Sequence, residues 1–340
     1  MAMRPRPVRR PMGYWQTGGL WIACGRCSIM NLSMLFKVCG WVICGSVAMT
    51  GRAAELRVMS FNLWHGGDAG KQPLSQTAEV IRAARADVVG LQETGGYEKA
   101  KGAGRPDHGR KLAELLGWHY FDQGERTGIL SRFLIVTNTP GKWGVTLRLP
   151  SGHEVRMFNA HLNHSPYQPY QLAGIPYGSG RFINTADEAV EEARKARGAQ
   201  VGRLLSELKP AIAAGQPVFL TGDFNEPSHQ DWTARAAAAG QCRIAVQYPS
   251  TFAVTSAGMR DSFRTVHTDE VARPGWTWTP TTQPEDPKDR HDRIDFVFFA
   301  GGNMTVKRCD VVGEGKRFAD IVVQPYPSDH RAVVATMEIP

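Results

Sequence analysis

Short apolar runs separated by polar or glycine-rich stretches recur along the chain from residue 57 onward. Runs of this length, rich in Val, Ile, Phe and Trp, are typical of strands buried in a sheet. We expect strands at 57–64, 87–93, 118–121, 145–149, 155–160, 217–220, 293–299 and 332–337. The Pro150-Ser151-Gly152 step between two of these runs predicts a hairpin.

Other segments carry apolar residues at helical spacing. We expect helices at 76–86, 111–116, 186–209 and 232–239. Strands outnumber helices, hairpin signals mix with helical connections, and neither a repeat nor a linker divides residues 55–340. The pattern therefore predicts one α/β domain over 55–340, built from two layered sheets with outer helices.

Two aromatic stretches stand apart from this alternation. Residues 165–184 are rich in Tyr, Pro and Gly, and they include Tyr167 and Tyr170. The stretch is longer than an ordinary loop, which favours a substrate-facing insertion. Trp276 and Trp278 belong to a second aromatic stretch. We give equal weight to substrate contact and to ordinary packing for these four side chains, and also for Trp64 and Tyr177.

Polar residues follow several predicted strands, above all the strand at 217–220, which continues into Thr221-Gly222-Asp223-Phe224-Asn225-Glu226-Pro227. Gly222 lets the backbone bend, and Pro227 stops further extension. Asp223 and Asn225 are two residues apart, so they project from the same face while the backbone stays extended. On its own, such a pair is more simply a turn cap.

Other strands carry comparable residues. Glu93 ends the run at 87–93, and Asn62 lies within the run at 57–64, where it is either part of a site or a satisfied core amide. Asn159 and His161 alternate onto one face of their strand.

Two further acids, Asp295 and Asp329, lie in the C-terminal part of the chain. Asp295 lies between Ile294 and Phe296, so its carboxylate is desolvated, and a histidine is its least costly partner. His330 directly follows Asp329.

The chemistry of this set points to phosphate esters. Four carboxylates packed together would repel one another without a cation. Oxygen ligands with almost no thiolate favour a hard ion, Mg²⁺ or Mn²⁺, over zinc. A metal draws charge from phosphate oxygens, His and Asn donate hydrogen bonds, and an Asp–His couple handles water.

The formal charge of +8 does not indicate a nucleic-acid binder, because the excess lies in the leader. Residues 1–54 contain seven of the 40 Lys and Arg and no acid, which leaves 33 bases against 32 acids in 55–340. A local cationic patch is still compatible with this balance.

Residues 34–54 are typical of a secretory signal. Lys37 precedes the apolar run at 38–45, and Ser46-Val47-Ala48 offers a small-x-small cleavage site, with Ala53-Ala54 as a later one. We expect that residues 1–54 form a cleaved leader, that Met34 is a candidate internal start, and that the protein is secreted or periplasmic. The alternative is an uncleaved membrane anchor. After cleavage we expect no transmembrane segment and a monomer.

Four of the six cysteines lie in this leader, and a zinc site at Cys24-x-x-Cys27 is weakly supported because no second pair accompanies it. Cys242 and Cys309 could pair in an oxidising compartment.

Six motifs in chain order resemble the endonuclease/exonuclease/phosphatase superfamily, the DNase-I-like proteins. They are Ser60-Phe61-Asn62, Leu91-Gln92-Glu93-Thr94, Asn159-Ala160-His161-Leu162, Gly222-Asp223-Phe224-Asn225, Arg293-Ile294-Asp295-Phe296 and Ser328-Asp329-His330. The resemblance runs from residue 57 to the C-terminus and implies a four-layer α/β sandwich with the site at the sheet edges.

The resemblance also implies roles for individual residues. Glu93 is the expected main metal ligand, helped by Asp329 and Asn62. Asp223 orients or deprotonates the attacking water, and Asn225 holds the phosphate; either Asp223 or His330 can be the general base. His161 and His330 stabilise the charged transition state, with Asp295 fixing the tautomer of His330. Asn159 is expected to bind substrate.

Three functions are compatible with these observations. The leading hypothesis is a secreted or periplasmic Mg²⁺-dependent phosphoesterase acting on a small-molecule or lipid-derived phosphoester. A secreted nuclease is the second hypothesis, and its affinity would depend strongly on salt. A catalytically inactive binding module is the third, and retention of every charged residue of the set argues against it.

Overall fold

The structure is a computed structural model that describes residues 54–339. These residues belong to one compact unit of the chain. The predicted leader, its cleavage sites and the Cys24-x-x-Cys27 pair lie outside the described residues.

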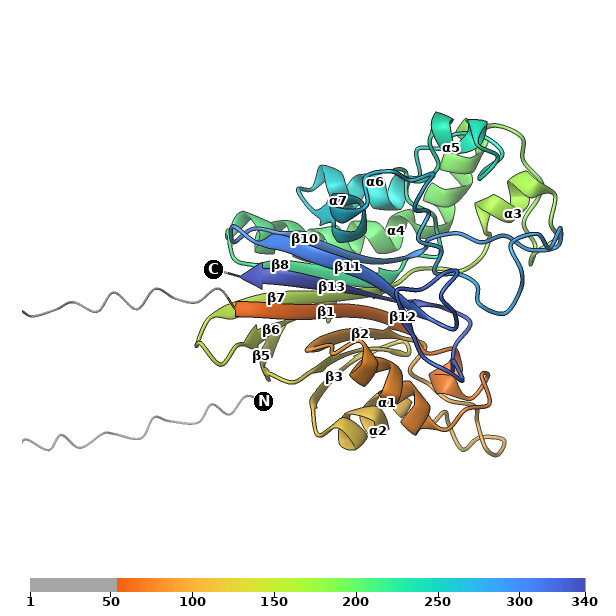
Figure 1. The fold of residues 1–340 in the computed structure, drawn as a ribbon. Coiled ribbons are helices and arrows are strands. Elements are labelled where there is room, and N and C mark those ends of the chain that lie inside the picture. Colours follow the sequence, from red (N-terminus) through yellow and green to blue (C-terminus); the bar gives the residue numbers. More distant parts are fainter. Residues whose placement is uncertain (1–53, 340) are drawn as a thin grey trace, which may run out of the picture. The chain divides into compact units, whose positions relative to one another are not determined.

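Two mixed sheets form the centre of the domain (Figure 1). The strands of the first sheet are β1 (Ala54–Asn62), β2 (Val88–Gln92), β3 (His119–Gly124), β4 (Thr127–Ser131), β11 (Thr305–Gly313), β12 (Ile321–Val322) and β13 (Ala332–Ile339). Their spatial order is β12-β11-β13-β1-β2-β4-β3. The strands of the second sheet are β5 (Leu134–Asn138), β6 (Gly144–Arg148), β7 (Glu154–His161), β8 (Val218–Asp223), β9 (Arg260–Asp261) and β10 (Asp295–Ala300). Their order is β5-β6-β7-β8-β10-β9.

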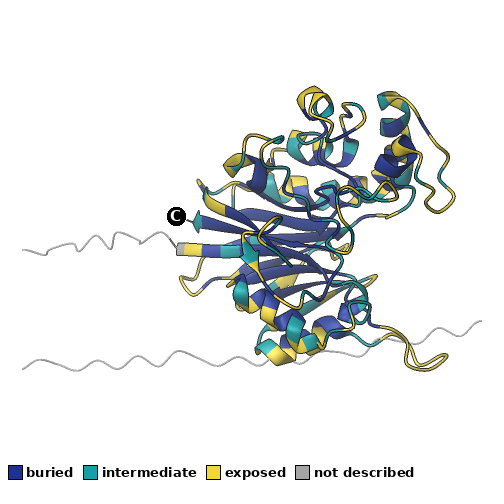
Figure 2. Cartoon of the chain, turned by 45° about the vertical axis from the view of Figure 1, so that its right-hand side comes forward, coloured by how far each residue is buried: buried dark blue, intermediate teal, exposed yellow. Residues whose placement is uncertain are grey.

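Helices cover the outer faces of the two sheets (Figure 1). The helical elements are η1 (His65–Gly67), α1 (Leu74–Ala83), α2 (His108–Leu116), α3 (Gln168–Ala173), α4 (Ala186–Ala213), α5 (Ala234–Ala238), α6 (Pro249–Ser256) and α7 (Ser262–Val266). Apolar residues of α1 and α2 pack on the first sheet, and those of α4 and α6 pack on the second. Figure 2 shows the strands buried along most of their length, with exposed residues on helices and loops. The predicted four-layer α/β sandwich is thus confirmed.

The core between the sheets explains why the predicted runs are continuously apolar. Val58 and Val88 of the first sheet pack in one cluster with Leu147, Phe219 and Val297 of the second. Strands such as β2, β8 and β10 are buried on both faces, one toward the other sheet and one toward helices, and every residue in them is buried. Such strands lose the alternation of half-exposed strands.

Some elements differ from the sequence prediction. The prediction missed β11, whose first four residues are mostly exposed and include Lys307 and Arg308, so no apolar run marks its start. The predicted helix at 186–209 continues through Pro210 to Ala213. Proline removes one helical N–H, but Ala211 and Ile212 still pack against the core, which offsets that loss.

A buried polar bridge joins the two sheets behind the site. Asn159 Oδ1 accepts hydrogen bonds from Gln92 Nε2 (2.7 Å) and Thr221 Oγ1 (3.0 Å), and Asn159 Nδ2 donates to Leu91 O (3.0 Å). The side chain is only 1% exposed. This corrects the expected role of Asn159 as a substrate contact, because its polar atoms are already used between the sheets.

Gly90 allows this close approach, and we expect Gly90→Ala to destabilise the domain. A methyl group at this position would lie 1.9 Å from Thr221 Oγ1 and 2.4 Å from Asn159 Oδ1. Overpacking combined with disturbed buried hydrogen bonds should cost about 3 kcal/mol in the free energy of unfolding. Gly198→Ala, at an exposed position of α4, is the control, because its added methyl meets nothing within 4 Å. That control should stabilise by about 0.5–1 kcal/mol. Urea unfolding of both variants checks this, and equal midpoints for Gly90→Ala and wild type would contradict it.

Cys242 and Cys309 are both buried and unbonded to each other, so the pairing left open by the sequence does not occur in this structure. Among residues 54–339, none of the helices has the length and apolar character needed to span a membrane.

Candidate active site

Strand pairing in the second sheet places three chemically active residues side by side. β7 and β8 run parallel, with His161 opposite Asp223, and β8 and β10 run antiparallel, with Asp295 opposite Asp223. Asp223 therefore lies between a histidine and an aspartate on its two neighbouring strands. Residues far apart in the sequence meet here because the end of β8 and the start of β10 share one edge of the sheet.

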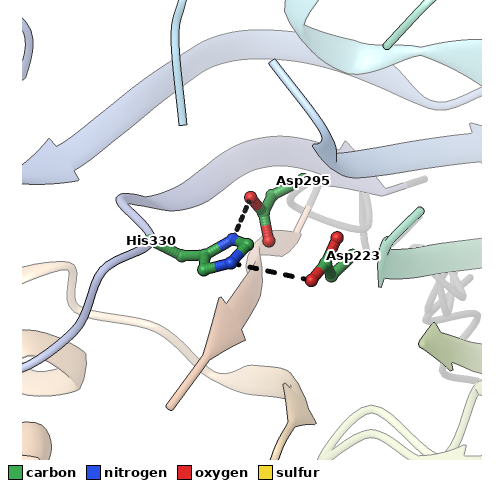
Figure 3. A group of neighbouring side chains, drawn as sticks. All are labelled: Asp223, Asp295 and His330. Carbon is green, nitrogen blue, oxygen red and sulfur yellow. Dashed lines mark hydrogen bonds and ion pairs between the residues drawn. The ribbon is translucent and has the colours of Figure 1, made fainter. Parts of the chain in front are cut away.

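Asp295 and His330 form a buried hydrogen-bonded pair (Figure 3). Asp295 Oδ2 lies 2.9 Å from His330 Nδ1, and the two residues are 0% and 5% exposed. The other ring nitrogen, Nε2, lies 3.8 Å from Asp223 Oδ2. The imidazole is thus held between two carboxylates.

These carboxylates decide the charge of His330. Burial alone lowers the pKa of the imidazole, but Asp295 and Asp223 outweigh burial and raise its pKa well above the usual value. Burial raises the pKa of Asp295, which His330 counteracts. The two carboxylates therefore favour the protonated imidazole, with Nδ1–H donating to Asp295.

Asp223 receives hydrogen bonds from two asparagines. Asn62 Nδ2 donates to Asp223 Oδ2 at 2.9 Å, and the Asn225 backbone N–H donates to Oδ1 at 2.8 Å. His161 Nε2 lies 3.6 Å from Oδ2. The carboxylate is 1% exposed and held in one orientation by these contacts.

In this structure the amides of both asparagines contact protein groups, and their roles toward metal and phosphate stay predictions. Asn62 was expected to help bind metal, but its Oδ1 accepts the Trp64 N–H at 3.0 Å while its Nδ2 donates to Asp223. Asn225 was expected to hold phosphate, but its Nδ2 donates to Leu162 O (3.1 Å) and Asp223 Oδ2 (3.2 Å). With these partners, both amides orient Asp223.

Glu93 directly follows β2 in a left-handed conformation, with φ of 56°. Its Oε2 accepts the backbone N–H of His65 at 2.9 Å, and its carbonyl accepts the N–H of Gly66 at 2.7 Å. Burial by itself raises the pKa of Glu93, but His161, the His65 N–H and His330 together outweigh it and lower the pKa. Glu93 is therefore ionised at neutral pH.

Asp329 has an unsatisfied oxygen. Its Oδ1 is buried without a hydrogen-bond partner and lies 4.0 Å from His330 Nε2. Burial raises the pKa of Asp329 to about 6, with Glu93 adding to the effect against the opposing influence of His330.

This donor set fits a hard divalent cation. Glu93 and Asp329 both line the same cavity, and both provide carboxylate oxygens, the ligands that Mg²⁺ and Mn²⁺ prefer. A bound cation would give the unpaired Oδ1 of Asp329 a partner, and it would also offset the repulsion between the two carboxylates. Ligand atoms of Asp223, Asp295 and His330 also lie within 4.8 Å of one another, but the imidazolium already neutralises charge there.

A cavity of about 270 Å³ gathers most of the predicted site residues. Six of the eight expected catalytic or metal-binding residues line it, all except Asn62 and Asp295: Glu93, His161, Asp223, Asn225, Asp329 and His330. Of the expected substrate contacts, Tyr167 and Trp278 also line it.

The other two aromatic residues do not reach this cavity. Tyr170 is 7% exposed and donates its hydroxyl to Asp289, and Trp276 packs against His291 and Phe318. Of the two interpretations left open by the sequence, the structure therefore supports packing for both. Tyr167 lines the cavity but donates its hydroxyl to Asp292 at 2.8 Å, so it offers its ring only.

Trp64 and Tyr177, for which the sequence left substrate contact and packing equally open, also line the cavity. Sequence reasoning missed His65 and Arg126, which line it as well. His65 had a usable signal, because it follows the predicted strand at 57–64 beside two glycines that allow a sharp turn. Arg126 had none, because it lies in a hairpin turn between β3 and β4 with no motif around it.

We expect Asp329→Asn to stabilise the metal-free protein at neutral pH. The folded-state pKa of about 6 exceeds the usual value of 3.8, so the ionised acid costs stability above pH 6, and this cost disappears below pH 4. The gain should be about 2 kcal/mol after allowing for partial exposure. Thermal unfolding in EDTA at pH 7 and pH 3.5 checks it; equal gains at both pH values would contradict the electrostatic cause.

Comparison with known proteins agrees with the geometry. The model of the "Endonuclease/Exonuclease/phosphatase family" matches residues 59–330. An uncharacterized protein of Caenorhabditis elegans is 27% identical over 330 residues, which cover 90% of this chain and 98% of that protein.

Two solved structures share the fold. An endonuclease/exonuclease/phosphatase from Beutenbergia cavernae is 21% identical, with a TM-score of 0.50, covering 85% of this chain and 72% of that one. The 3′ phosphatase NExo from Neisseria, bound to a product DNA hairpin, is 16% identical, with a TM-score of 0.51 and coverage of 84% and 99%. Since the family match spans most of the chain, including every residue of the site described above, the protein belongs to the endonuclease/exonuclease/phosphatase family.

Proposed function

We propose that the protein hydrolyses a phosphate ester by in-line attack of water, assisted by Mg²⁺ or Mn²⁺. The observation that supports this best is the buried Asp295–His330 pair, whose free ring nitrogen faces Asp223 beside a cavity lined by Glu93 and Asp329. The family is defined by endonucleases, exonucleases and phosphatases, all of which act on phosphoesters.

His330 is the charge-stabilising group in this proposal. Asp295 accepts from Nδ1, which leaves the protonated Nε2 as a donor on the cavity side. A cationic donor next to the phosphate oxygens stabilises the negative charge that builds up during attack. His161, which also lines the cavity, is placed to donate to the same phosphate.

Asp223 is then the residue that orients water. Its carboxylate lies 3.8 Å from His330 Nε2, and because the raised pKa of His330 favours the protonated imidazole, Asp223 is the better acceptor for the O–H of the attacking water. Asn62 and Asn225 fix the direction of its carboxylate. Glu93 and Asp329 would hold the divalent cation, which supplies positive charge that offsets the charge of the phosphate group.

The favoured substrate is a small-molecule or lipid-derived phosphoester. The balanced charge of residues 55–340 and the aromatic side chains of Trp64, Trp278 and Tyr177 around the cavity support it. A nuclease is the second candidate, because the structurally similar NExo is a 3′ phosphatase bound to a DNA hairpin and Arg126 adds a cation to the cavity lining.

A substrate panel tests this proposal. Residues 55–340 would be assayed on p-nitrophenyl phosphate, bis-p-nitrophenyl phosphate, sphingomyelin and plasmid DNA, each with Mg²⁺ and with EDTA. We expect hydrolysis of at least one phosphoester with Mg²⁺ only. Undiminished turnover in EDTA would overturn the metal assignment, and hydrolysis of DNA alone would establish the nuclease.

We also propose that the protein is exported and loses its first ~48–54 residues, on the basis of the small-x-small sites after the apolar run. N-terminal sequencing of the protein from culture medium or periplasm should begin within residues 49–55. A full-length product retained in the membrane would contradict this and favour an uncleaved anchor.

A further inference from the structure

A second cavity of about 240 Å³ lies next to the active site, and His161 lines both. Its walls come from the turn between β3 and β4, the turn between β5 and β6, and α4. Apart from His161, the mechanism proposed above uses none of the residues that line it. Because it adjoins the active-site cavity at His161, it is a candidate for binding another part of the same substrate.

The lining of this cavity carries an excess of positive charge. Lys142 and Arg203 contribute permanent cations, and Glu125 is the one acid among the lining residues. Arg126, the next residue along the turn, lines the active-site cavity instead. Because the charges of residues 55–340 nearly balance, this local excess is a property of the site rather than of the whole surface.

A network of hydrogen bonds fixes the backbone of the cavity. Gln123 Nε2 donates to the carbonyls of Lys142 (2.9 Å), Trp143 (3.0 Å) and Asn159 (3.0 Å). Asn159 Nδ2 in turn donates to Gln123 Oε1 at 2.8 Å. The turn that carries Lys142 is therefore tied to the polar bridge between the two sheets.

The same turn is also tied to α4. Glu207 of α4 accepts hydrogen bonds from Thr139 Oγ1 and from the Gly141 N–H. Glu207 lies one turn beyond Arg203 on α4, so its carboxylate is already hydrogen-bonded to the turn. These contacts hold the turn that carries Lys142 against the helix that carries Arg203. The arrangement is preorganised, which lowers the entropic cost of binding an anion.

We propose that this cavity binds a second phosphate group of the substrate, so that the preferred substrates are phosphoesters with two phosphate groups. The inference rests on the proposed function, since it takes His161 as the boundary between the scissile phosphate and the second one. Lys142 and Arg203 donate charge-assisted hydrogen bonds to the second phosphate. Because both side chains are exposed, together they should favour such a substrate by about tenfold.

Two synthetic esters with the same leaving group provide the test. Thymidine 5′-(p-nitrophenyl phosphate) carries one phosphate, and thymidine 3′-phosphate 5′-(p-nitrophenyl phosphate) adds a second one. We expect the ratio of kcat/KM for the second ester over the first to be about ten in wild type at low salt. The ratio should fall as ionic strength rises, because contacts at exposed cations are screened.

The variant Lys142→Met/Arg203→Met removes both cations while keeping unbranched side chains. We expect it to bring the ratio close to one. The matched control is Arg194→Met/Lys209→Met, which removes two exposed charges from α4 away from this cavity and should keep the ratio of wild type. A ratio near one in wild type, or an unchanged ratio in Lys142→Met/Arg203→Met, would overturn the proposal.

The test separates this inference from the proposed function. Hydrolysis of both esters at equal efficiency would leave the phosphoesterase standing and refute the second phosphate site. If neither ester is hydrolysed, calorimetric binding of thymidine 3′,5′-bisphosphate against thymidine 5′-monophosphate decides the second site by itself. Tighter binding of the bisphosphate in wild type but not in Lys142→Met/Arg203→Met would support it, and equal binding would refute it.

Discussion

We expect Asp295→Asn to lower turnover by about 10²–10⁴-fold at saturating Mg²⁺, the range typical of a positioned acid–base group. The substitution keeps the volume of a side chain that is 0% exposed, so the fold should persist. It removes the carboxylate that accepts from His330 Nδ1 at 2.9 Å. His330 then loses both its fixed orientation and the charge that is the largest cause raising its pKa.

The pH profile provides a readout that a purely structural role would not change. In wild type, the protonated form of His330 is the active one, so activity should be lost as pH rises through its raised pKa. In Asp295→Asn that pKa falls, and the loss of activity should move to lower pH. Asp187→Asn, an exposed acid at the start of α4, is the matched control and should leave the profile unchanged.

The pair should behave as one unit in a double-mutant cycle. His330→Ala should cost a similar factor to Asp295→Asn, and the double variant should cost little more, because either change alone already disables the couple. Fully additive losses would mean that Asp295 acts independently, for example as a second metal ligand together with Asp223. Near-wild-type turnover of His330→Ala would overturn the catalytic assignment.

The second large effect concerns the metal. We expect EDTA to abolish turnover and Glu93→Gln to raise the half-saturating Mg²⁺ concentration by about 10–100-fold, the usual cost of weakening a metal site. Glu93 is ionised because its pKa is lowered, so the amide removes a full ligand charge while keeping the shape. The His65 N–H that donates to Oε2 can still donate to the amide oxygen, which keeps the side chain in place.

Titration of activity with Mg²⁺ in wild type and Glu93→Gln measures this effect. Glu79→Gln, an exposed acid on α1, is the control and should titrate like wild type. An unchanged half-saturating concentration in Glu93→Gln would show that Glu93 is not a ligand. A raised concentration with normal turnover at saturation would separate metal binding from the proton chemistry of Asp223 and His330.

The sequence by itself determined the central strands and most of the catalytic set. β1, β2, β8 and β10 pack against the other sheet on one face and against helices on the other. Because both faces are buried, these strands appear in the sequence as largely apolar runs. Within such a run, a charged residue such as Asp295 stands out because it needs a partner. Glu93, Asp223 and His330 were recognisable for a related reason, because strands of this kind end together at one edge of a sheet.

Only the tertiary structure decided what the amide and aromatic side chains do. An asparagine can donate or accept in the core as well as in a site, and its partner is not near in sequence: Asn62 contacts Asp223 across 161 positions, and Asn159 contacts Gln92 across 67. An aromatic ring packs equally well in either place, so Trp278 and Tyr177 reach the cavity while Trp276 and Tyr170 do not. Such side chains carry no charge that demands a particular neighbour, so their roles follow from the three-dimensional packing of the chain.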